Sequence, residues 1–360
     1  MRKKRVLHYI PGFKIGGIES LFLDLVTEID NSKYEIFLLV EKDIPEDSIN
    51  FLNKNKIKIY KNDVSIRKHP ISYLKEMYTL LKKLEIDILH LHIFLSRIYM
   101  IFLAKILNIS KIVVHAHTTN LDLVSKIGRK FYYLFNKKNI IEVACAKEAG
   151  ECLFGKSNNF ITVTNGVNFE KFKFNNNIKK EYIEKLKLEN KKIIGMIGRI
   201  SYQKNQRFAI EIFEKLNNFD RNYVLLLIGN EADDKEIPQL VKKKKLEDKV
   251  IFLGARNDIK ELLSLIDIYL MPSRYEGLSV GLLEAQASGV QCLISNTITY
   301  KNIVTENVTV LSLNDTPKIW AEKIIELYDK GRENINYSDL SESEYSIRTF
   351  TKQIEKVYDK

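Results

Sequence analysis

The sequence predicts an α/β protein built from two doubly wound, Rossmann-like domains, and three observations support this prediction. Apolar strands alternate with amphipathic helices from one end of the chain to the other, which is typical of parallel sheets covered by helices. The chain has 360 residues, more than one ordinary core needs, so two domains are expected. The polar motifs fall where strands end, and open parallel sheets bind ligands at the carboxyl ends of their strands.

The first domain is expected to span residues 1–168. Its first apolar run, Val6–Ile10, is short and ends at Pro11, so we interpret it as a strand rather than as part of a signal peptide. The helix that follows carries one apolar stripe, formed by Leu21, Phe22, Leu25, Val26 and Ile29. Further strands are predicted at Glu35–Val40, Ile86–Leu91, Lys111–His115, Ile141–Ala146 and Phe160–Val163.

The second domain is expected to span residues 181–340. Residues 169–180 are rich in Asn and Lys and are predicted to form the linker before it. Residues 341–360 are predicted to form a final helix with Ile347, Phe350, Ile354 and Val357 on one face. The strands predicted in this half are Lys192–Ile197, Tyr223–Ile228, Val250–Leu253, Asp267–Met271 and Val290–Ile294.

The composition narrows the class of protein. Hydrophobic residues make up 45% of the chain and charged residues 29%, an ordinary globular balance. The three cysteines include no C-x-x-C pair, which fits a reducing compartment better than a disulfide or zinc framework. The net charge of +11 favours acidic partners, but no nucleic-acid motif accompanies it. The apolar stretch Ile93–Leu107 is too short to span a bilayer and carries Arg97 and Lys105.

Two glutamates that lie eight residues apart, Glu276 and Glu284, form the most informative motif. A buried strand is predicted before them, so Glu276 falls in a strand-to-helix turn and Glu284 about one turn inside the helix. The backbone N–H groups of Ser279, Val280 and Gly281 point out of the helix start and can bind an anion. An anion site with a carboxylate on either side suits a sugar nucleotide, whose diphosphate binds the helix and whose hydroxyl groups bind the carboxylates.

Two cations, Arg199 and Lys204, flank the turn after another predicted strand. They could neutralise a leaving diphosphate, although in a chain with 57 lysines and arginines such a pair by itself indicates only surface charge. Gly16 and Gly17 precede the first helix and could face the same diphosphate. The G-x-G-x-x-G spacing of a dinucleotide fingerprint is missing, which disfavours a Rossmann dehydrogenase.

All six histidines fall within the first 117 residues, and four of them form the pairs His90/His92 and His115/His117. Residues i and i+2 of a strand share a face, so a metal site is conceivable if the two strands are neighbours. No carboxylate or cysteine lies beside them at ligand spacing, which disfavours a bound metal.

Five segments occur in the order typical of one enzyme family. They are Gly16-Gly-Ile-Glu19, His115-Ala-His117, Asn165-Gly-Val-Asn168, Gly198-Arg199 with Lys204-Asn205, and Arg274–Val290. Together they resemble retaining glycosyltransferases of the GT-B fold, specifically family 4 (glycosyl transferases group 1). The resemblance covers nearly the whole chain. The stretches Ala144–Gly155 and Leu282–Gly289 are similar to those of bacterial enzymes that build capsular or exopolysaccharide repeat units.

The resemblance implies a GT-B fold, with two domains that face each other across a cleft and a final helix that crosses back to the first domain. It implies catalytic roles for His117, Glu276, Arg199 and Lys204. The implied donor site comprises Gly16, Gly17, Arg199, Lys204, Arg256, Glu276, Gly277, Leu278, Ser279, Val280 and Glu284. It places His90, His92 and His115 on the acceptor side, and His115 is the alternative to His117 near the anomeric centre. Many relatives have Asp where this chain has Asn168, so a charged role is not expected there.

The expected activity is transfer, with retention, of a hexosyl or N-acetylhexosaminyl group from a nucleotide-diphosphate sugar, expected to be UDP-linked, to a glycan acceptor. No D-x-D triplet occurs, so no divalent metal or other cofactor is expected, and the helix start with Arg199 and Lys204 would bind the diphosphate. The basic start Arg2–Arg5 and the stretch Ile93–Leu107 favour a cytoplasmic enzyme that docks on the inner membrane surface and takes a lipid-linked acceptor.

Two alternatives remain open. A sugar-nucleotide epimerase on the same fold would need no acceptor, so turnover of donor alone would identify it. A non-catalytic partner subunit of a glycosyltransferase would keep the fold without the chemistry. Such subunits typically lose the charges of the donor site, whereas this chain keeps all four.

Overall fold

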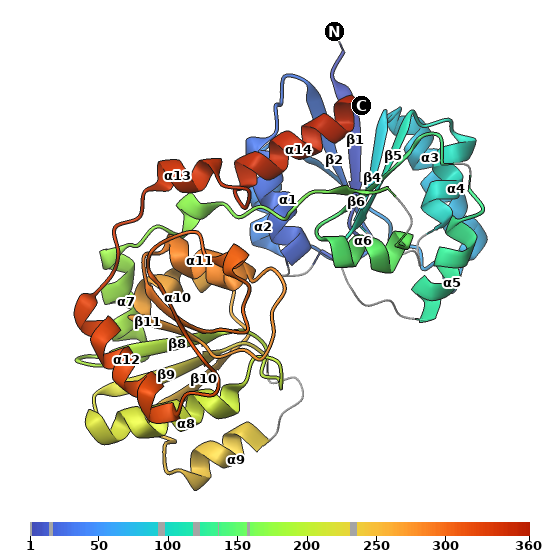
Figure 1. Cartoon of the computed structure of the whole chain (residues 1–360). Coiled ribbons are helices and arrows are strands. Elements are labelled where there is room, and N and C mark those ends of the chain that lie inside the picture. The colour runs from blue at the N-terminus through green and yellow to red at the C-terminus, as the bar shows by residue number, and fades with distance from the viewer. Residues whose placement is uncertain are drawn as a thin grey trace. The chain divides into compact units, whose positions relative to one another are not determined.

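The chain forms two compact units, Met1–Gly166 with Glu344–Lys360, and Val167–Ser343 (Figure 1). The computed structural model describes residues 2–13, 17–92, 98–117, 123–135, 137–156, 159–230 and 236–360. Each unit is a parallel sheet with helices on both faces, so the predicted α/β class with two doubly wound sheets is confirmed. Among the described residues, no helix is both long and apolar enough to cross a membrane.

The first unit contains a seven-stranded sheet with the order β3-β2-β1-β4-β5-β6-β7. The strands are β1 (Lys4–Tyr9), β2 (Tyr34–Val40), β3 (Lys58–Lys61), β4 (Ile88–Leu91), β5 (Lys111–Ala116), β6 (Ile140–Ala144) and β7 (Ile161–Thr162). The helices between them are α1 (Gly17–Glu28), α2 (Glu46–Lys54), α3 (Pro70–Leu84), α4 (Tyr99–Ile106), α5 (Leu123–Tyr132) and α6 (Lys147–Phe154). The sequence analysis missed β3, an edge strand whose four residues include two exposed lysines and no buried side chain.

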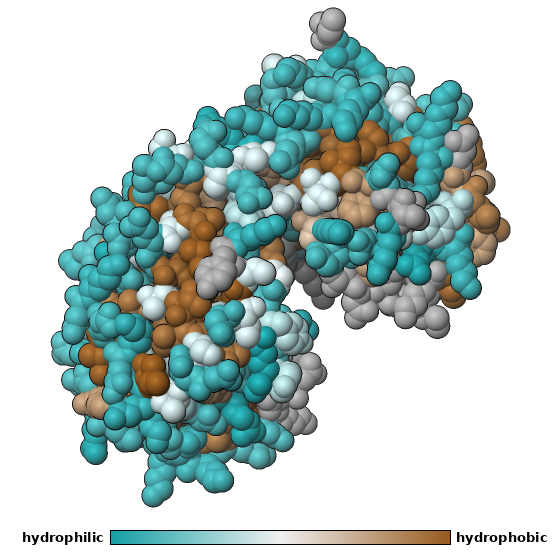
Figure 2. All heavy atoms as spheres, in the orientation of Figure 1, coloured by the Kyte–Doolittle hydropathy of each residue, from teal (hydrophilic) through white to brown (hydrophobic). Residues whose placement is uncertain are grey.

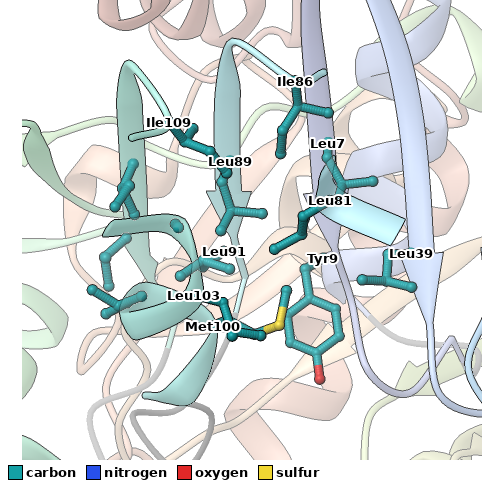
Figure 3. Packing of buried hydrophobic residues seen from close by; sticks show 14 of the residues in the cluster. Leu7, Tyr9, Leu39, Leu81, Ile86, Leu89, Leu91, Met100, Leu103 and Ile109 are labelled. Carbon is teal, nitrogen blue, oxygen red and sulfur yellow. The ribbon is translucent and has the colours of Figure 1, made fainter. Parts of the chain in front are cut away.

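The two faces of this sheet bury separate apolar clusters, because successive strand residues point to opposite faces. On one face, α3 and α4 pack against β1, β2 and β4. Figure 3 shows that packing, with Leu81 and Met100 directed at Leu7 and Tyr9. The other face is covered by α1 and by the last helix, α14 (Ile347–Asp359).

Helix α14 belongs to the first unit although it lies at the end of the chain. Ser346 caps its start, because the hydroxyl of Ser346 accepts a hydrogen bond from the N–H of Thr349 at 3.0 Å. Its apolar face packs on the strands of the first sheet through Ile347, Phe350, Ile354, Val357 and Tyr358. The prediction that the final helix crosses back to the first domain is therefore confirmed, although the helix begins later than residue 341.

The second unit contains a six-stranded sheet with the order β10-β9-β8-β11-β12-β13. The strands are β8 (Lys192–Ile197), β9 (Tyr223–Ile228), β10 (Val250–Gly254), β11 (Ile268–Met271), β12 (Gln291–Ser295) and β13 (Val308–Leu311). The helices are α7 (Asn176–Leu186), α8 (Gln206–Phe219), α9 (Glu236–Lys243), α10 (Ile259–Leu265), α11 (Val280–Ala287), α12 (Pro317–Lys330) and α13 (Tyr337–Glu342). Strand β13 was also missed, and like β3 it lies at an edge with no buried residue.

The linker predicted at residues 169–180 is wrong, because this segment is folded into the second unit. Residues Phe169–Phe172 form a 3₁₀ helix, and Phe169 is buried. Asn175 then caps α7, since its side-chain oxygen accepts hydrogen bonds from the N–H groups of Asn177 and Ile178. The asparagines that suggested a loop therefore include a helix cap, and α7 packs against α10.

Candidate donor site and histidine cluster

Helix α11 begins where the sequence predicts, with Ser279 as the residue before its first turn. The N–H groups of Leu282 and Leu283 turn back to the carbonyl oxygen of Ser279, so those of Val280 and Gly281 come first at the helix start. The Ser279 hydroxyl donates to Sδ of Met271 at 3.7 Å instead of capping the helix. The helix start therefore keeps donors that can bind an anion.

Hydrogen bonds join the turns that follow the neighbouring strands β8 and β11. The backbone N–H of Arg274 donates to the carbonyl oxygen of Gln203 at 2.8 Å. The side-chain amide of Gln203 donates to the carbonyl of Tyr275 at 3.1 Å and to Oε2 of Glu276 at 3.3 Å. Asn205 donates to the carbonyl of Pro272 at 3.0 Å. The sequence analysis assigned no role to Gln203, whose partners lie about seventy residues further along the chain.

The structure pairs Lys204 with Glu276, two residues for which the sequence predicted separate partners. Lys204 Nζ lies 2.8 Å from Oε1 of Glu276, and the glutamate side chain is only 7% exposed. The contact has the distance of an ion pair, but Oε1 makes no hydrogen bond of good geometry to any described residue. The carboxylate is therefore held in place by Lys204 and Gln203, and its Oε1 is a buried acceptor with an unused lone pair.

Tyr269, which the sequence analysis did not single out, lies close enough to both glutamates to interact with them electrostatically. It is 1% exposed in β11, and burial, Cys292, Glu284 and Glu276 together raise the pKa of its hydroxyl well above the ordinary value. A Cβ atom on Gly281 would lie 3.3 Å from that hydroxyl. Glu276 and half-buried Glu284 thus lie near one neutral hydroxyl under the start of α11. The feature of the sequence that could have indicated this residue is a tyrosine within an otherwise apolar strand.

The other predicted donor-site residues differ in how far they are exposed and in whether they already have a partner. Arg199 and Gly277 are exposed, whereas Leu278 and Arg256 are half-buried. Arg256 is already engaged, because its Nε donates to Oδ1 of Asp258 at 2.8 Å. Gly17 is the first residue of α1, and Gly16 lies outside the described residues.

Two glycines shape the edge of the second sheet next to Arg199. Gly198 and Gly229 directly follow β8 and β9 and have φ of 147° and 150°, values that favour glycine. A Cβ atom on Gly229 would lie 2.2 Å from the carbonyl oxygen of Gly198, and one on Gly198 would lie 2.9 Å from Cε of Lys204. The close approach of these two turns positions the backbone that carries Arg199 and Lys204.

Five of the six histidines gather on the face of the first sheet that α1 and α14 cover. They are His8 in β1, His90 and His92 at the end of β4, and His115 and His117 at the end of β5. His8 and His90 are paired in register across neighbouring strands. Burial lowers the pKa of all five rings, that of His8 to about 3 and that of His117 to about 4. The five imidazoles are therefore neutral at pH 7.

Two subsets of these rings could hold a metal ion, because one nitrogen from each ring lies within 4.8 Å of the others. The subsets are His8, His90 and His92, and His92, His115 and His117. Most of these nitrogens already bond to one another or to the Tyr358 hydroxyl. The condition that the sequence analysis set for a metal site is met, since β4 and β5 are neighbours.

Two parallel-sheet units and an anion-binding helix start flanked by carboxylates are the features of a GT-B glycosyltransferase. The sequence of the first unit matches the family described as "Glycosyl transferase 4-like" over residues 17–149. That of the second unit matches "Glycosyl transferases group 1" over residues 178–343. The chain therefore belongs to the group 1 glycosyltransferases, family 4 of the GT-B fold.

The names of similar proteins are consistent with membership of this family. The chain is 29% identical over 344 residues to the "Putative glycosyltransferase EpsF" of Bacillus subtilis, covering 92% of this chain and 89% of that protein. It is 26% identical over 304 residues to the capsular polysaccharide biosynthesis glycosyltransferase CapH of Staphylococcus aureus, with 77% and 78% covered. A third relative is the Escherichia coli UDP-Gal:alpha-D-GlcNAc-diphosphoundecaprenol alpha-1,3-galactosyltransferase, 33% identical over 165 residues, with 42% and 41% covered.

Solved structures share the fold at low sequence identity. Anabaena HepE in complex with UDP and glucose superposes with a TM-score of 0.74 at 15% identity, covering 98% of this chain and 99% of that one. A glycosyltransferase from Rickettsia africae superposes with a TM-score of 0.75 at 17% identity, with 99% and 98% covered.

Proposed function

We propose that this glycosyltransferase moves a hexosyl or N-acetylhexosaminyl group, with retention, from a UDP-sugar to a lipid-linked glycan during synthesis of a capsular or exopolysaccharide. The observation that carries the proposal is the arrangement at α11, where the Lys204–Glu276 ion pair precedes a helix start that Ser279 does not cap and Glu284 lies in the helix itself. The name of CapH, a capsular polysaccharide biosynthesis glycosyltransferase, supports the pathway class. UDP-linked donors are named for the E. coli relative and for HepE.

In this proposal each part of the site acts on one part of the donor. Glu284 accepts hydrogen bonds from the ribose hydroxyls, and Glu276 accepts them from the transferred sugar. The first N–H groups of α11, with Arg199 and Lys204, stabilise the departing diphosphate. From the family resemblance we assign His117 a role at the anomeric centre and His90, His92 and His115 roles on the acceptor side. Neither glutamate is assigned as a nucleophile, so departure and attack on the same face of the sugar is proposed.

Replacing the two glutamates tests the assignment. We expect Glu284→Ala to weaken UDP binding about ten- to a hundredfold, and Glu276→Gln to lower kcat by a similar factor. The reason is that losing a hydrogen bond to a charged group costs about 1.5–3 kcal/mol. UDP binding is measured by calorimetry and turnover by release of UDP from candidate UDP-sugars. Glu322→Ala, on the exposed surface of α12, is the matched control. Folded variants that bind and turn over donor like the parent would refute the site.

Stereochemistry and metal dependence test the mechanism. We propose that transfer needs no divalent cation, because cationic side chains and a helix start already surround the diphosphate site. Activity is expected to survive EDTA, and NMR of the product is expected to show the anomeric configuration of the donor. Loss of activity in EDTA with recovery in Mn²⁺ would contradict the metal-free mechanism, and an inverted product would contradict retention.

The first unit offers a surface for docking on the cytoplasmic face of the inner membrane. Phe102 and Ile106 of α4 and Ile127 and Phe131 of α5 are all at least half exposed, and Leu134 is 80% exposed. Figure 2 shows hydrophobic surface over α4, on the right of the view. Basic residues flank these side chains, including Lys105 and Lys130.

The basic start of the chain contributes less to docking than the sequence suggested. Arg2 forms an ion pair with Asp87 at 2.6 Å, and Arg5 forms one with Glu35 at 3.2 Å. Arg97 lies outside the described residues. The docking proposal therefore rests on α4 and α5.

Co-sedimentation with liposomes tests the docking surface. Each lysine or arginine near an anionic bilayer contributes about 1 kcal/mol, so binding to anionic but not neutral liposomes is expected, and it should weaken in high salt. Phe102→Ser with Phe131→Ser should abolish binding, whereas Ile319→Ser, an exposed residue of α12, should not. Equal recovery in the supernatant with both lipid types would refute docking.

A further inference from the structure

The five buried histidines and Tyr358 are joined by an unbroken series of hydrogen bonds, here called the histidine chain. His117 Nε2 lies 3.0 Å from His92 Nδ1, and His92 Nε2 lies 2.9 Å from His8 Nδ1. His8 Nε2 lies 3.0 Å from the Tyr358 hydroxyl, which lies 2.6 Å from His90 Nδ1. His90 Nε2 lies 3.2 Å from His115 Nδ1.

The histidine chain has two open ends. Nδ1 of His117 and Nε2 of His115 are buried and have no hydrogen-bond partner among the residues that the structure describes. The two rings lie next to each other, with centroids 4.0 Å apart. All other ring nitrogens of the five histidines are used within the chain.

Each direct link joins Nδ1 of one ring to Nε2 of the next, and this restricts the tautomers. A neutral imidazole carries one proton, so one ring nitrogen donates and the other accepts. If one ring carries its proton on Nε2, the Nδ1 of its neighbour must be bare, and that neighbour is also protonated on Nε2. Tyr358 transmits the same restriction, because its hydroxyl donates to one ring and accepts from the other.

We infer that the histidine chain is a single tautomeric unit in which all five rings are protonated on Nδ1 or all five on Nε2, and that Tyr358 is the positioning residue that joins its two halves. One open end is then always a donor and the other always an acceptor. Switching the chain reverses both ends: a proton enters at one end, each link passes one proton along, and one leaves at the other end. No net charge enters the core.

The same count explains why hydrogen bonding competes with metal binding here. Six protons, five from the rings and one from Tyr358, serve five links and one open end. A neutral chain therefore has only one unprotonated ring nitrogen that does not already accept a hydrogen bond. A metal held by three of these rings needs three lone pairs at one point. Two of the existing links would therefore have to break.

The consequence for catalysis rests on the proposed function. If His117 meets a sugar hydroxyl, its free Nδ1 donates in one state of the chain and accepts in the other. Tyr358 then sets the hydrogen-bonding role of His117 through His8 and His92, although it lies in the C-terminal helix.

The tautomers can be observed directly by ¹⁵N NMR of the full-length protein labelled at histidine. In the parent at neutral pH, five neutral rings of one tautomer are expected, apart from the exposed His69. Tyr358→Phe removes the joining hydroxyl, so the group of His117, His92 and His8 should adopt its tautomer independently of His90 and His115. Mixed tautomers among the five rings of the parent would overturn the inference, as would a Tyr358→Phe spectrum with the parent's tautomers unchanged.

Kinetics provide a second readout with a matched control. Tyr34→Phe also removes a tyrosine hydroxyl beside α14, one that bonds Asp359 at 2.9 Å and not the histidine chain. We expect Tyr358→Phe to lower kcat about tenfold, the scale of one neutral hydrogen bond, with KM for the donor unchanged, and Tyr34→Phe to leave kcat near the parent value. An equal loss in both variants would mean that Tyr358 is merely structural. A parent with uniform tautomers but no transferase activity would refute the proposed function and leave the chain intact.

Discussion

Single residues set the geometry of the donor site, because two of its glycines lie too close to their neighbours to carry a side chain. Gly229, directly after β9, lies against the carbonyl of Gly198, and Gly198 leaves space for Lys204. Lys204 in turn reaches Glu276 across neighbouring strands. The ion pair therefore depends on the absence of a side chain at Gly198 and Gly229.

At the residue scale, Gly229→Ala tests this dependence. The added Cβ would lie 2.2 Å from a backbone oxygen, and φ is 150°, so about 3 kcal/mol of stability should be lost. Urea unfolding measures the change. Gly277→Ala is the control, because its Cβ would meet nothing within 4 Å. Equal stability of both variants would show that the turn relaxes freely.

Elements far apart in sequence complete each other's cores, and α14 is the clearest case. Its apolar face covers β1 and β4 beside α1. It also supplies Tyr358, whose hydroxyl forms hydrogen bonds with His8 and His90. Without this hydroxyl, one buried ring nitrogen of each histidine would lose its partner. The helix therefore serves both packing and the polar network of the first unit.

At the element scale, Ile354→Ala should destabilise the first unit. Ile354 is fully buried, and removing such a side chain costs about 2–5 kcal/mol, since a cavity remains. Lys352→Ala, on the exposed face of the same helix, should change little. Thermal unfolding of the two variants separates the outcomes, and similar melting temperatures would argue against a stabilising role for α14.

The whole molecule carries an acid sensitivity that follows from its neutral histidines. Burial lowers the pKa of His8 from 6.5 to about 3, so the folded state resists protons that the unfolded chain accepts. Above pH 6.5 the ring of His8 is neutral in both the folded and the unfolded state, so it does not lower the free energy of unfolding. As the pH falls from 6.5 towards 3, each such ring removes about 1.4 kcal/mol of unfolding free energy per pH unit.

Urea unfolding at about pH 7.5 and about pH 5 tests this expectation. The parent should lose stability over this interval more steeply than a His8→Phe variant. His69→Gln changes the one exposed histidine and should retain the slope of the parent. An unfolding free energy that stays constant between the two pH values would contradict buried neutral rings.

The sequence by itself determined the fold class, most strands and the placement of the glutamate motif. These features are local: strands follow from apolar runs, and α11 begins at Val280 because a strand, a turn and a helix follow one another directly. The edge strands β3 and β13, which bury no side chain, were missed. The linker was misplaced because a helix cap and a loop both favour asparagine.

Only the tertiary structure decided which polar groups meet. Lys204 pairs with Glu276 because β8 and β11 are neighbours in the sheet, an order that periodicity does not reveal. His8 bonds Tyr358 across 350 positions of sequence because α14 returns to the first sheet. Hydrogen bonds and ion pairs act over a few ångströms, so such partners are fixed by strand order and helix docking rather than by spacing along the chain.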